Sequence, residues 1–429
     1  MSKTLPTGCS KSFFRHLNKA ARKSGFIQRV SRKFSAAGYL FSLIQATLNG
    51  KASFNQLAMN LKISESKALS KQAVWKRTNR QAVAFMLEAL SLSLQEKWRR
   101  SLSKIPPLKT RFARVLVQDS TQQKLPKENH DLFPAHGNGK SHTAGIKVDL
   151  AIDLLHGRTI FAHLQGATEQ DRDLGKNLVD QVRREDLVLR DRGYFSLAEF
   201  RMIEGKNAYW LSRVPSNLII KMAGEDLDLE KILGSRKSNL LDLKVTLGEE
   251  RHPARLVAIR CHPEVTRQAL LEATQRAQSR GRTLSKAQRL RCGWHLVVTN
   301  VGADLMAAPD VSELYRCRWN IEIIFRAWKQ SANLGKALKR RSNEDHFQVL
   351  ILAGMIYQVM SLAMIALMRV IIDNRRISYE KLFDNFSEWI MKSKSLGELW
   401  DFDPDPRHVV MESRKDRRPL EDTWVALLS

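Results

Sequence analysis

Three acidic residues in this chain have the types and positions that phosphate chemistry needs. Asp119 and Asp191 each follow a short apolar run, 114–118 and 187–190, and each run predicts a buried strand. Ligands bind at the carboxyl ends of strands in open α/β sheets, so both carboxylates are expected at the rim of a sheet. Taken alone, each aspartate is better explained as a turn or N-cap residue.

A predicted helix over 310–330 adds a third carboxylate. At 100° per residue, Tyr315, Arg318, Glu322 and Lys329 fall within a stripe about 60° wide. The residues roughly opposite form an apolar stripe that would face the core: Cys317, Ile321, Ile324 and Trp328. A merely solvated face is the alternative, but such a face rarely begins with tyrosine or sets one acid among bases.

Two aspartates and one glutamate on separate elements suit a pair of Mg²⁺ ions, which prefer hard oxygen ligands. Two such ions about 3.5–4 Å apart stabilise the attacking and leaving oxygens of an in-line phosphoryl displacement. Beside them, Arg318 could bind a phosphate through two parallel hydrogen bonds, and Lys329 could act as a point charge.

The four residues of the polar stripe match, in type and spacing, the Y-R-E-K box of bacterial insertion-sequence transposases. These enzymes belong to the DDE superfamily, in the cut-and-paste group that excises through DNA hairpins. The stretch Asp119–Thr121 resembles the first aspartate motif of that family, and Asp191–Phe195 resembles the second. The resemblance extends over roughly residues 50–370.

The resemblance implies an α/β fold with a ribonuclease-H-like catalytic core, a β-rich insertion and an α-helical N-terminal DNA-binding domain. We expect end recognition in 1–104, the core in 105–205 and 301–373, and the insertion in 206–300. A C-terminal helical region, 374–429, could serve dimerisation. The 131 residues between Asp191 and Glu322 exceed a simple core connection and contain several predicted elements. These are strands at 208–213, 240–247, 255–260 and 294–299 and a basic helical stretch near 264–290.

The resemblance also implies an activity. Asp119, Asp191 and Glu322 would bind two Mg²⁺ ions, for which Mn²⁺ is expected to substitute. Tyr315, Arg318 and Lys329 would hold the 5′ phosphate of the non-transferred strand. The substrates would be double-stranded DNA, namely the inverted-repeat ends of the element and a target, paired by a homodimer.

Three further residues are candidate DNA contacts. A flipped base needs an aromatic surface, and Trp294 and Trp319 match the family's aromatic residues near such a base. Each tryptophan could instead pack between insertion and core. Arg213, at the end of a predicted strand, is a weaker candidate.

The charge is concentrated at the N-terminus. The whole chain has 429 residues and a net charge of +27, and residues 1–114 hold 23 Lys and Arg against three acids, a net +20. The remaining residues hold 48 basic and 41 acidic side chains, a net +7. Such a block attracts nucleic acid by displacing condensed counterions, although a solvated basic face is the alternative.

Within this block, residues 54–63 and 70–77 resemble a helix-turn-helix. Ser70 would cap the second helix, whose Gln72, Lys76 and Arg77 would then face DNA. Short basic helix pairs are common, so this pattern alone does not establish a recognition helix.

Other patterns exclude some classes of protein. The four cysteines never form a C-x-x-C pair, which excludes a disulfide scaffold and a structural zinc module and fits a reducing compartment. The N-terminus has no apolar signal region. Residues 347–368 carry no charge and have the length of a membrane span, but Gln348, Gln358 and Ser361 favour a buried helix. We therefore expect a bacterial, cytoplasmic, nucleoid-associated protein with no membrane partner.

Two alternatives stay open. A DNA-binding repressor would use the basic domain with an inactive core, and a metal-dependent nuclease would cut DNA without strand transfer. The complete set of three carboxylates argues against the repressor.

Overall fold

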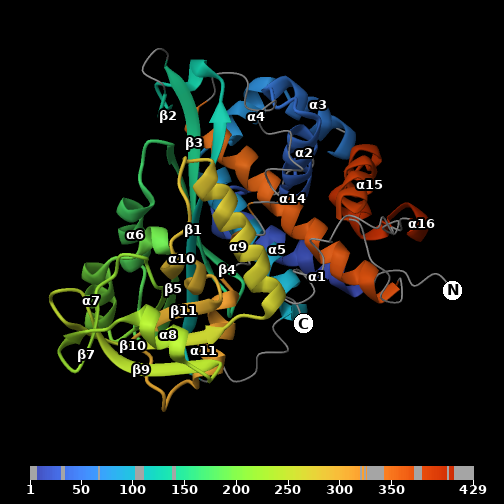
Figure 1. The fold of residues 1–429 in the computed structure, drawn as a ribbon. Coiled ribbons are helices and arrows are strands. Elements are labelled where there is room, and N and C mark those ends of the chain that lie inside the picture. The colour runs from blue at the N-terminus through green and yellow to red at the C-terminus, as the bar shows by residue number, and fades with distance from the viewer. Residues whose placement is uncertain are drawn as a thin grey trace. The chain divides into compact units, whose positions relative to one another are not determined.

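The fold is mixed α/β, as the sequence predicts (Figure 1). The computed structural model describes residues 7–29, 34–65, 68–101, 111–137, 142–318, 321–322, 325, 343–371, 379–402 and 405–409. The chain divides into two compact units. Unit 1 comprises residues 1–106, 119–170 and 320–429, and unit 2 comprises residues 107–118 and 171–319.

Most of unit 1 is helical. Its N-terminal helices are α1 (Thr7–Lys23), α2 (Ala36–Asn49), α3 (Phe54–Glu65), α4 (Lys71–Arg77) and α5 (Arg80–Ser101). Its C-terminal helices are α14 (Glu344–Ile371), α15 (Tyr379–Lys392) and α16 (Pro406–Val409). The described part of the basic N-terminal block is therefore mainly helical.

The helix α14 covers the uncharged run of the sequence. It packs against α2 and α5, and its described side chains from Phe347 to Ser361 are buried, apart from the half-buried Gln348. A helix surrounded by others can be apolar on every side, which explains the absence of charge. In the part of the chain that the structure describes, no helix is long and apolar enough to cross a membrane.

Four strand segments complete unit 1: the second half of β1 (Arg114–Leu125), β2 (Pro134–Ala135), β3 (Thr143–Asp153) and β4 (Arg158–Gly166). β3 and β4 form an antiparallel pair, and α5 packs on β4. Their turn contains Gly157 at φ +62°, and a β-carbon there would lie 2.9 Å from the backbone of Gln95 on α5. Only glycine therefore permits both the turn and the close helix.

Unit 2 contains a sheet in the order β1-β5-β6-β11-β10-β9-β7-β8. β1, β5 (Asp186–Arg190) and β6 (Tyr209–Arg213) run parallel, and the pairs beyond β6 are antiparallel. The other strands are β7 (Ile220–Met222), β8 (Glu225–Asp226), β9 (Leu240–Leu247), β10 (His252–Arg260) and β11 (Trp294–Thr299). The helices are α6 (Asp171–Val179), α7 (Leu197–Gly205), α8 (Leu229–Ser235), α9 (Pro263–Gln278), α10 (Lys286–Arg291) and α11 (Ala308–Arg316).

The first strand is longer than the sequence predicts. The apolar run predicts an end at Gln118, but β1 continues to Leu125, so Asp119 lies inside the strand. The extension is polar, but burial still alternates along it: Thr121 and Leu125 are buried, and Gln122 and Lys124 are exposed. Alternating burial of this kind is typical of a strand even where the sequence contains no apolar run.

The predicted long helix over 310–330 is also wrong at its centre. α11 ends at Arg316, and the Arg318 N–H donates to the carbonyl of Tyr315, three residues back, instead of four. The helix α11 therefore does not continue through Cys317 and Arg318, so the angles calculated for one continuous helix do not apply.

Candidate active site

Asp191 directly follows β5, at the end of the strand where the sequence places it. β5 pairs in parallel with β1, and the register runs from Arg114 opposite Asp186 to Val117 opposite Leu189. Asp191 precedes a short 3₁₀ turn, but its side chain makes no capping hydrogen bond there. Asp191 is therefore an N-cap residue by position, as one explanation predicts, but capping does not account for its side chain.

A buried polar cluster joins β1 and β5 through Gln118 and Arg190, the residues directly before Asp119 and Asp191. Arg190 is fully buried, and its Nη1 donates to Oε1 of Gln118 at 2.5 Å. Its Nη2 donates to the carbonyl of Gly175 at 2.8 Å and to Oε2 of Glu199 at 3.1 Å. The Gln118 amide donates in turn to the carbonyl of Leu174 at 2.9 Å. A buried arginine with several acceptors holds its backbone in one place.

Burial raises the pKa of the Glu199 carboxyl, and the positive charge of Arg190 lowers it. The two groups are only 3.1 Å apart, so the ion pair offsets part of the free energy that burying both charges requires.

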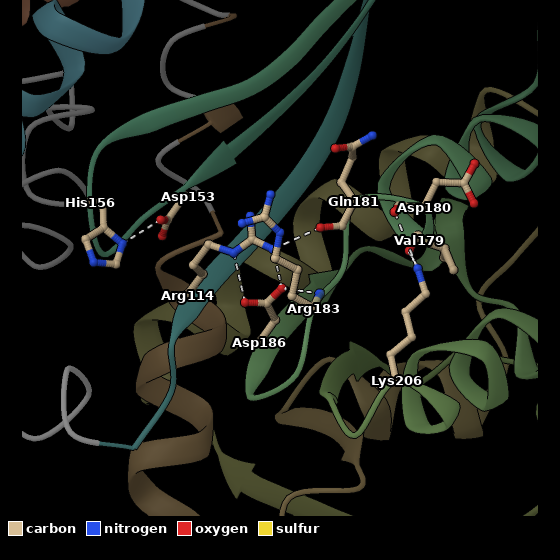
Figure 2. A network of polar contacts seen from close by, with 9 residues as sticks. All are labelled: Arg114, Asp153, His156, Val179, Asp180, Gln181, Arg183, Asp186 and Lys206. Atoms are coloured by element: carbon tan, nitrogen blue, oxygen red, sulfur yellow. Dashed lines mark hydrogen bonds and ion pairs between the residues drawn. The ribbon is translucent and has the colours of Figure 1, made fainter.

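A second ion pair fixes the other end of the same two strands (Figure 2). Arg114 donates through Nε to Oδ1 of Asp186 at 2.9 Å and through Nη2 to Oδ2, so the pair is bidentate. The same Nη2 donates to the carbonyl of Gln181, and the Arg183 N–H donates to Asp186 at 2.6 Å. Asp186 is fully buried, so its carboxylate depends on these donors instead of water, whereas the bond from Arg114 to Gln181 is exposed.

The two clusters lie four residues apart on paired strands, so they fix the register of β1 against β5. A slip of one residue would turn every side chain to the opposite face of the sheet, including Asp191. We conclude that buried charge, together with apolar packing, sets the direction of the Asp191 carboxylate.

Two residues of the polar stripe contact Asp191 directly. The Tyr315 hydroxyl donates to the carbonyl of Arg190 at 3.1 Å and lies 3.4 Å from Oδ1 of Asp191. Arg318 lies 3.7 Å from the same carboxylate oxygen. Tyr315 and Arg318 are 2% and 3% exposed, so both side chains are buried beside Asp191. Burial raises the pKa of the Tyr315 hydroxyl, so it remains a hydrogen-bond donor at neutral pH.

Further cations and a neutral histidine lie near Tyr315. His295 packs against the Tyr315 ring at 5.4 Å and shares a 2.7 Å hydrogen bond with the Ser312 hydroxyl. Burial, together with the positive charges of Arg213 and Arg316, lowers the pKa of His295 to about 4. His295 is therefore uncharged at neutral pH, and the positive potential near Asp191 comes from arginine.

The other two predicted carboxylates, Asp119 and Glu322, belong to unit 1 and are half-buried. Oδ1 of Asp119 accepts the N–H of Ser120 at 2.8 Å. Among the described residues, no group of three or more His, Cys, Asp or Glu side chains is arranged to hold a metal ion.

The other residues predicted to contact DNA differ in their surroundings. Trp294 is 3% exposed, and the guanidinium of the exposed Arg260 lies over its ring at 4.4 Å. Arg213 is half-buried at the end of β6. Trp319 and Lys329 lie outside the described residues.

The predicted helix pair in the basic block is α3 and α4. Ser70 caps α4, since its hydroxyl accepts the Ala73 N–H at 3.2 Å, as predicted. Gln72 and Lys76 are exposed, whereas Arg77 is half-buried: it donates to the carbonyl of Ala73 and lies over the ring of Phe34 at 5.0 Å. Sequence reasoning did not single out Trp75, which is 52% exposed on the same helix.

Sequence reasoning also missed Gln118, Arg190 and Glu199. The available signal was a charged or amide residue at the last position of each apolar strand, directly before the aspartate. Residues of these types are seldom fully buried unless they are paired with one another.

Comparison with known proteins supports one family. The family model described as "Transposase DDE domain" matches residues 110–358. The transposase for insertion sequence element IS231F of Bacillus thuringiensis subsp. israelensis is 26% identical, over 77% of this chain and 74% of its own. The transposase for IS1151 of Clostridium perfringens is 26% identical, over 91% and 87%.

A solved structure of the piggyBac transposase synaptic complex with hairpin DNA aligns with 90% of this chain and 80% of its own, at 12% identity. Its TM-score of 0.34 is too low to support an argument about fold.

Proposed function

The chain belongs to the transposase DDE-domain family of bacterial insertion sequences, and from that premise we propose that it cuts DNA at the ends of its element and joins the 3′ hydroxyls to target DNA. One observation carries the proposal: the family match over 110–358 includes Asp119, Asp191 and Glu322, the three residues that the motifs single out. The buried clusters that hold Asp191 support a role that needs a fixed carboxylate.

The donor set fits a divalent metal. The three side chains offer only carboxylate oxygens, which are the ligands that Mg²⁺ prefers, and all three are partly exposed. We propose that Asp119, Asp191 and Glu322 hold two Mg²⁺ ions, for which Mn²⁺ substitutes. When bound, the ions would neutralise charge on a scissile phosphate and lower the pKa of an attacking water.

The residues around Asp191 have separate tasks in this proposal. Tyr315 and Arg318 hold one oxygen of Asp191 and leave the other available, so they set its orientation. By resemblance, Tyr315, Arg318 and Lys329 also hold the 5′ phosphate of the non-transferred strand. Positioning of this kind contributes to the rate because a carboxylate that moves by about 1 Å can reduce turnover about a hundredfold.

The order of steps is proposed from the resemblance. Water hydrolyses one phosphodiester at the element end, which frees a 3′ hydroxyl. That hydroxyl attacks the opposite strand and closes a hairpin, and a second hydrolysis reopens it before the 3′ end joins the target. Trp294 and Trp319 would stack on a base displaced by the bend; for Trp294 this requires that Arg260 leave its ring.

We propose the following division of labour. Residues 1–104 read the inverted-repeat ends through Gln72, Lys76 and Arg77, and Arg213 adds a DNA contact. Residues 105–205 and 301–373 form a ribonuclease-H-like core, with 206–300 as its insertion. Residues 374–429 contribute to a homodimer that pairs two ends, and the protein acts on the bacterial nucleoid.

The test uses the full-length chain and DNA that carries the sequences flanking its coding region. Our proposal predicts cleavage at the element ends that requires Mg²⁺ or Mn²⁺, followed by joining of 3′ ends to a plasmid. Binding with no cleavage in either metal would indicate the repressor. Cleavage with no joined product would indicate the nuclease, and either result would contradict the proposal.

A further inference from the structure

A helical turn in unit 2 carries an unusual amount of exposed positive charge. α9 ends at Gln278, Gly281 adopts φ +63°, and α10 begins at Lys286 (Figure 1). Five exposed cations lie on this segment, which we call the α9–α10 turn: Arg276, Arg280, Arg282, Lys286 and Arg289. The sequence has no acid between Glu272 and Asp304.

The turn has a defined conformation. Ser285 and Gln288 form a reciprocal capping box at the start of α10, with hydrogen bonds of 3.1 and 3.0 Å. Arg291 anchors the same helix, because it donates to Glu230 at 2.8 Å and to the carbonyl of Ser216 at 3.0 Å. The five exposed cations are therefore presented by a folded segment with a fixed base.

Packing within the chain does not explain these cations. The structure describes α9 and α10 completely, and neither helix has a buried residue. None of the five cations forms an ion pair within the described part of the chain; Arg276 only donates to the carbonyl of Glu272. Like charges held this close repel one another, and a bound polyanion would relieve that repulsion.

The positive charge continues from the turn to Asp191. Arg213 and Arg276 both lie close enough to Arg192 to interact with its positive charge. Arg192 is the residue after Asp191, and Arg213 ends the neighbouring strand β6. The basic surface thus begins beside the candidate active site.

We propose that Arg192, Arg213 and the α9–α10 turn form one strip that binds the phosphate backbone of duplex DNA and guides it away from Asp191. The inference rests on the proposed function and adds a contact surface that the DDE motifs do not include. A protein partner fits less well: the large exposed apolar side chains of α9, Val265 and Leu271, both precede Arg276, the first of the five cations, by at least five residues.

The experiment compares two full-length variants that lose the same charge. The strip variant carries Arg280→Gln, Arg282→Gln, Lys286→Gln and Arg289→Gln. The matched control carries Arg183→Gln, Arg184→Gln, Lys237→Gln and Lys244→Gln, which neutralise four exposed cations elsewhere in unit 2. The probe is a labelled duplex of arbitrary sequence, about 40 base pairs long, titrated between about 50 and 200 mM salt.

Each phosphate contact contributes about 0.9 to the slope of log affinity against log salt, so we expect the strip variant to lose about 3–4 from that slope. The control variant should lose less than about 1. Equal slopes for the strip variant and the wild type, or equal losses in both variants, would overturn the inference. A larger loss of affinity for double-stranded RNA than for DNA would also overturn it.

A third variant separates this inference from the proposed function. Lys71→Gln with Lys76→Gln removes exposed cations of α4 in unit 1. If that variant weakens binding and the strip variant does not, only the strip is wrong; if the wild type binds no DNA, the proposed function also fails. As an independent readout, the duplex should protect Lys286 from acetylation and leave Lys237 reactive, and the reverse pattern would contradict the strip.

Discussion

The β1–β5 strand pair and the α9–α10 turn are both rich in arginine but use it in opposite ways. On the strands, Arg190 is fully buried and donates to three acceptors, and Arg114 forms a bidentate pair with the buried Asp186. On the turn, five cations are exposed, and their segment buries no side chain. Buried, paired charge fixes the strand that ends beside Asp191, and exposed charge is available to bind a polyanion.

The energetic consequences of mutation should differ in the same way. Removing one partner of a buried ion pair leaves the other charge without compensation, at about 3–5 kcal/mol. Removing an exposed cation changes stability by less than about 0.5 kcal/mol, because water already solvates it. The comparison is therefore testable through stability, independently of catalysis.

We expect the largest effect from Arg190→Met. The substitution leaves Glu199 and Gln118 buried without their donor, so unfolding free energy should fall by about 3–5 kcal/mol. Denaturant unfolding of the full-length chain measures this change. Arg184→Met is the control, because Arg184 is 78% exposed and should be nearly neutral.

A second variant tests the reason for that loss. Arg190→Met with Glu199→Met removes both charges and fills the space with apolar groups, so it should recover most of the lost stability. If Arg190→Met alone is as stable as the wild type, the cluster does not hold the strands, and the contrast between the two regions fails.

A smaller effect is expected from acid. The folded-state pKa of His295 is about 4 because it is buried, against about 6.5 when unfolded. Between these values the unfolded chain binds a proton that the folded chain does not. Stability is therefore complete above pH 6.5 and falls as pH drops towards 4, by about 3 kcal/mol for this one group.

His295→Gln should make the pH dependence shallower over this range, as measured by unfolding at pH 7.5, 6 and 5. His346 in unit 1, whose pKa burial also lowers to about 4, should preserve part of the dependence. An unchanged pH profile in His295→Gln would mean that this ring is accessible to protons in the folded chain.

The smallest effect should come from the turn. The strip variant removes four exposed cations, so its unfolding midpoint should match that of the wild type, or lie slightly above it as repulsion is relieved. Calorimetry of the two proteins measures the difference. A strong loss of stability would show that these residues serve the fold, and the two regions would then not differ in kind.

The sequence predicts well where apolar pattern and position agree. The strands β5, β9 and β11 lie within about one residue of their predicted bounds, because short apolar or alternating runs leave few alternatives. Ser70 caps α4 as predicted, since a hydroxyl before a helical run has one obvious role. The buried helix α14 follows from its lack of charge together with its few polar residues.

The rest depends on contacts that no local pattern contains. The polar half of β1 was missed because its alternation includes glutamines and a lysine. The end of α11 at Arg316 depends on a turn that brings Arg318 to Asp191, which is distant in sequence. In the sequence, Arg190 is only the last residue of a predicted strand. Its partners Gln118 and Glu199 reach it only in the folded chain.

The most direct test of the account is the cleavage activity of three conservative variants. Asp119→Asn, Asp191→Asn and Glu322→Gln each keep size and remove one carboxylate, and Asp180→Asn is the control on an exposed aspartate. With Mg²⁺ and DNA carrying the element ends, we expect each of the three to bind normally and to lose cleavage, and the control to cut at the wild-type rate. Normal cleavage by Glu322→Gln or Asp191→Asn would contradict the assignment of these carboxylates.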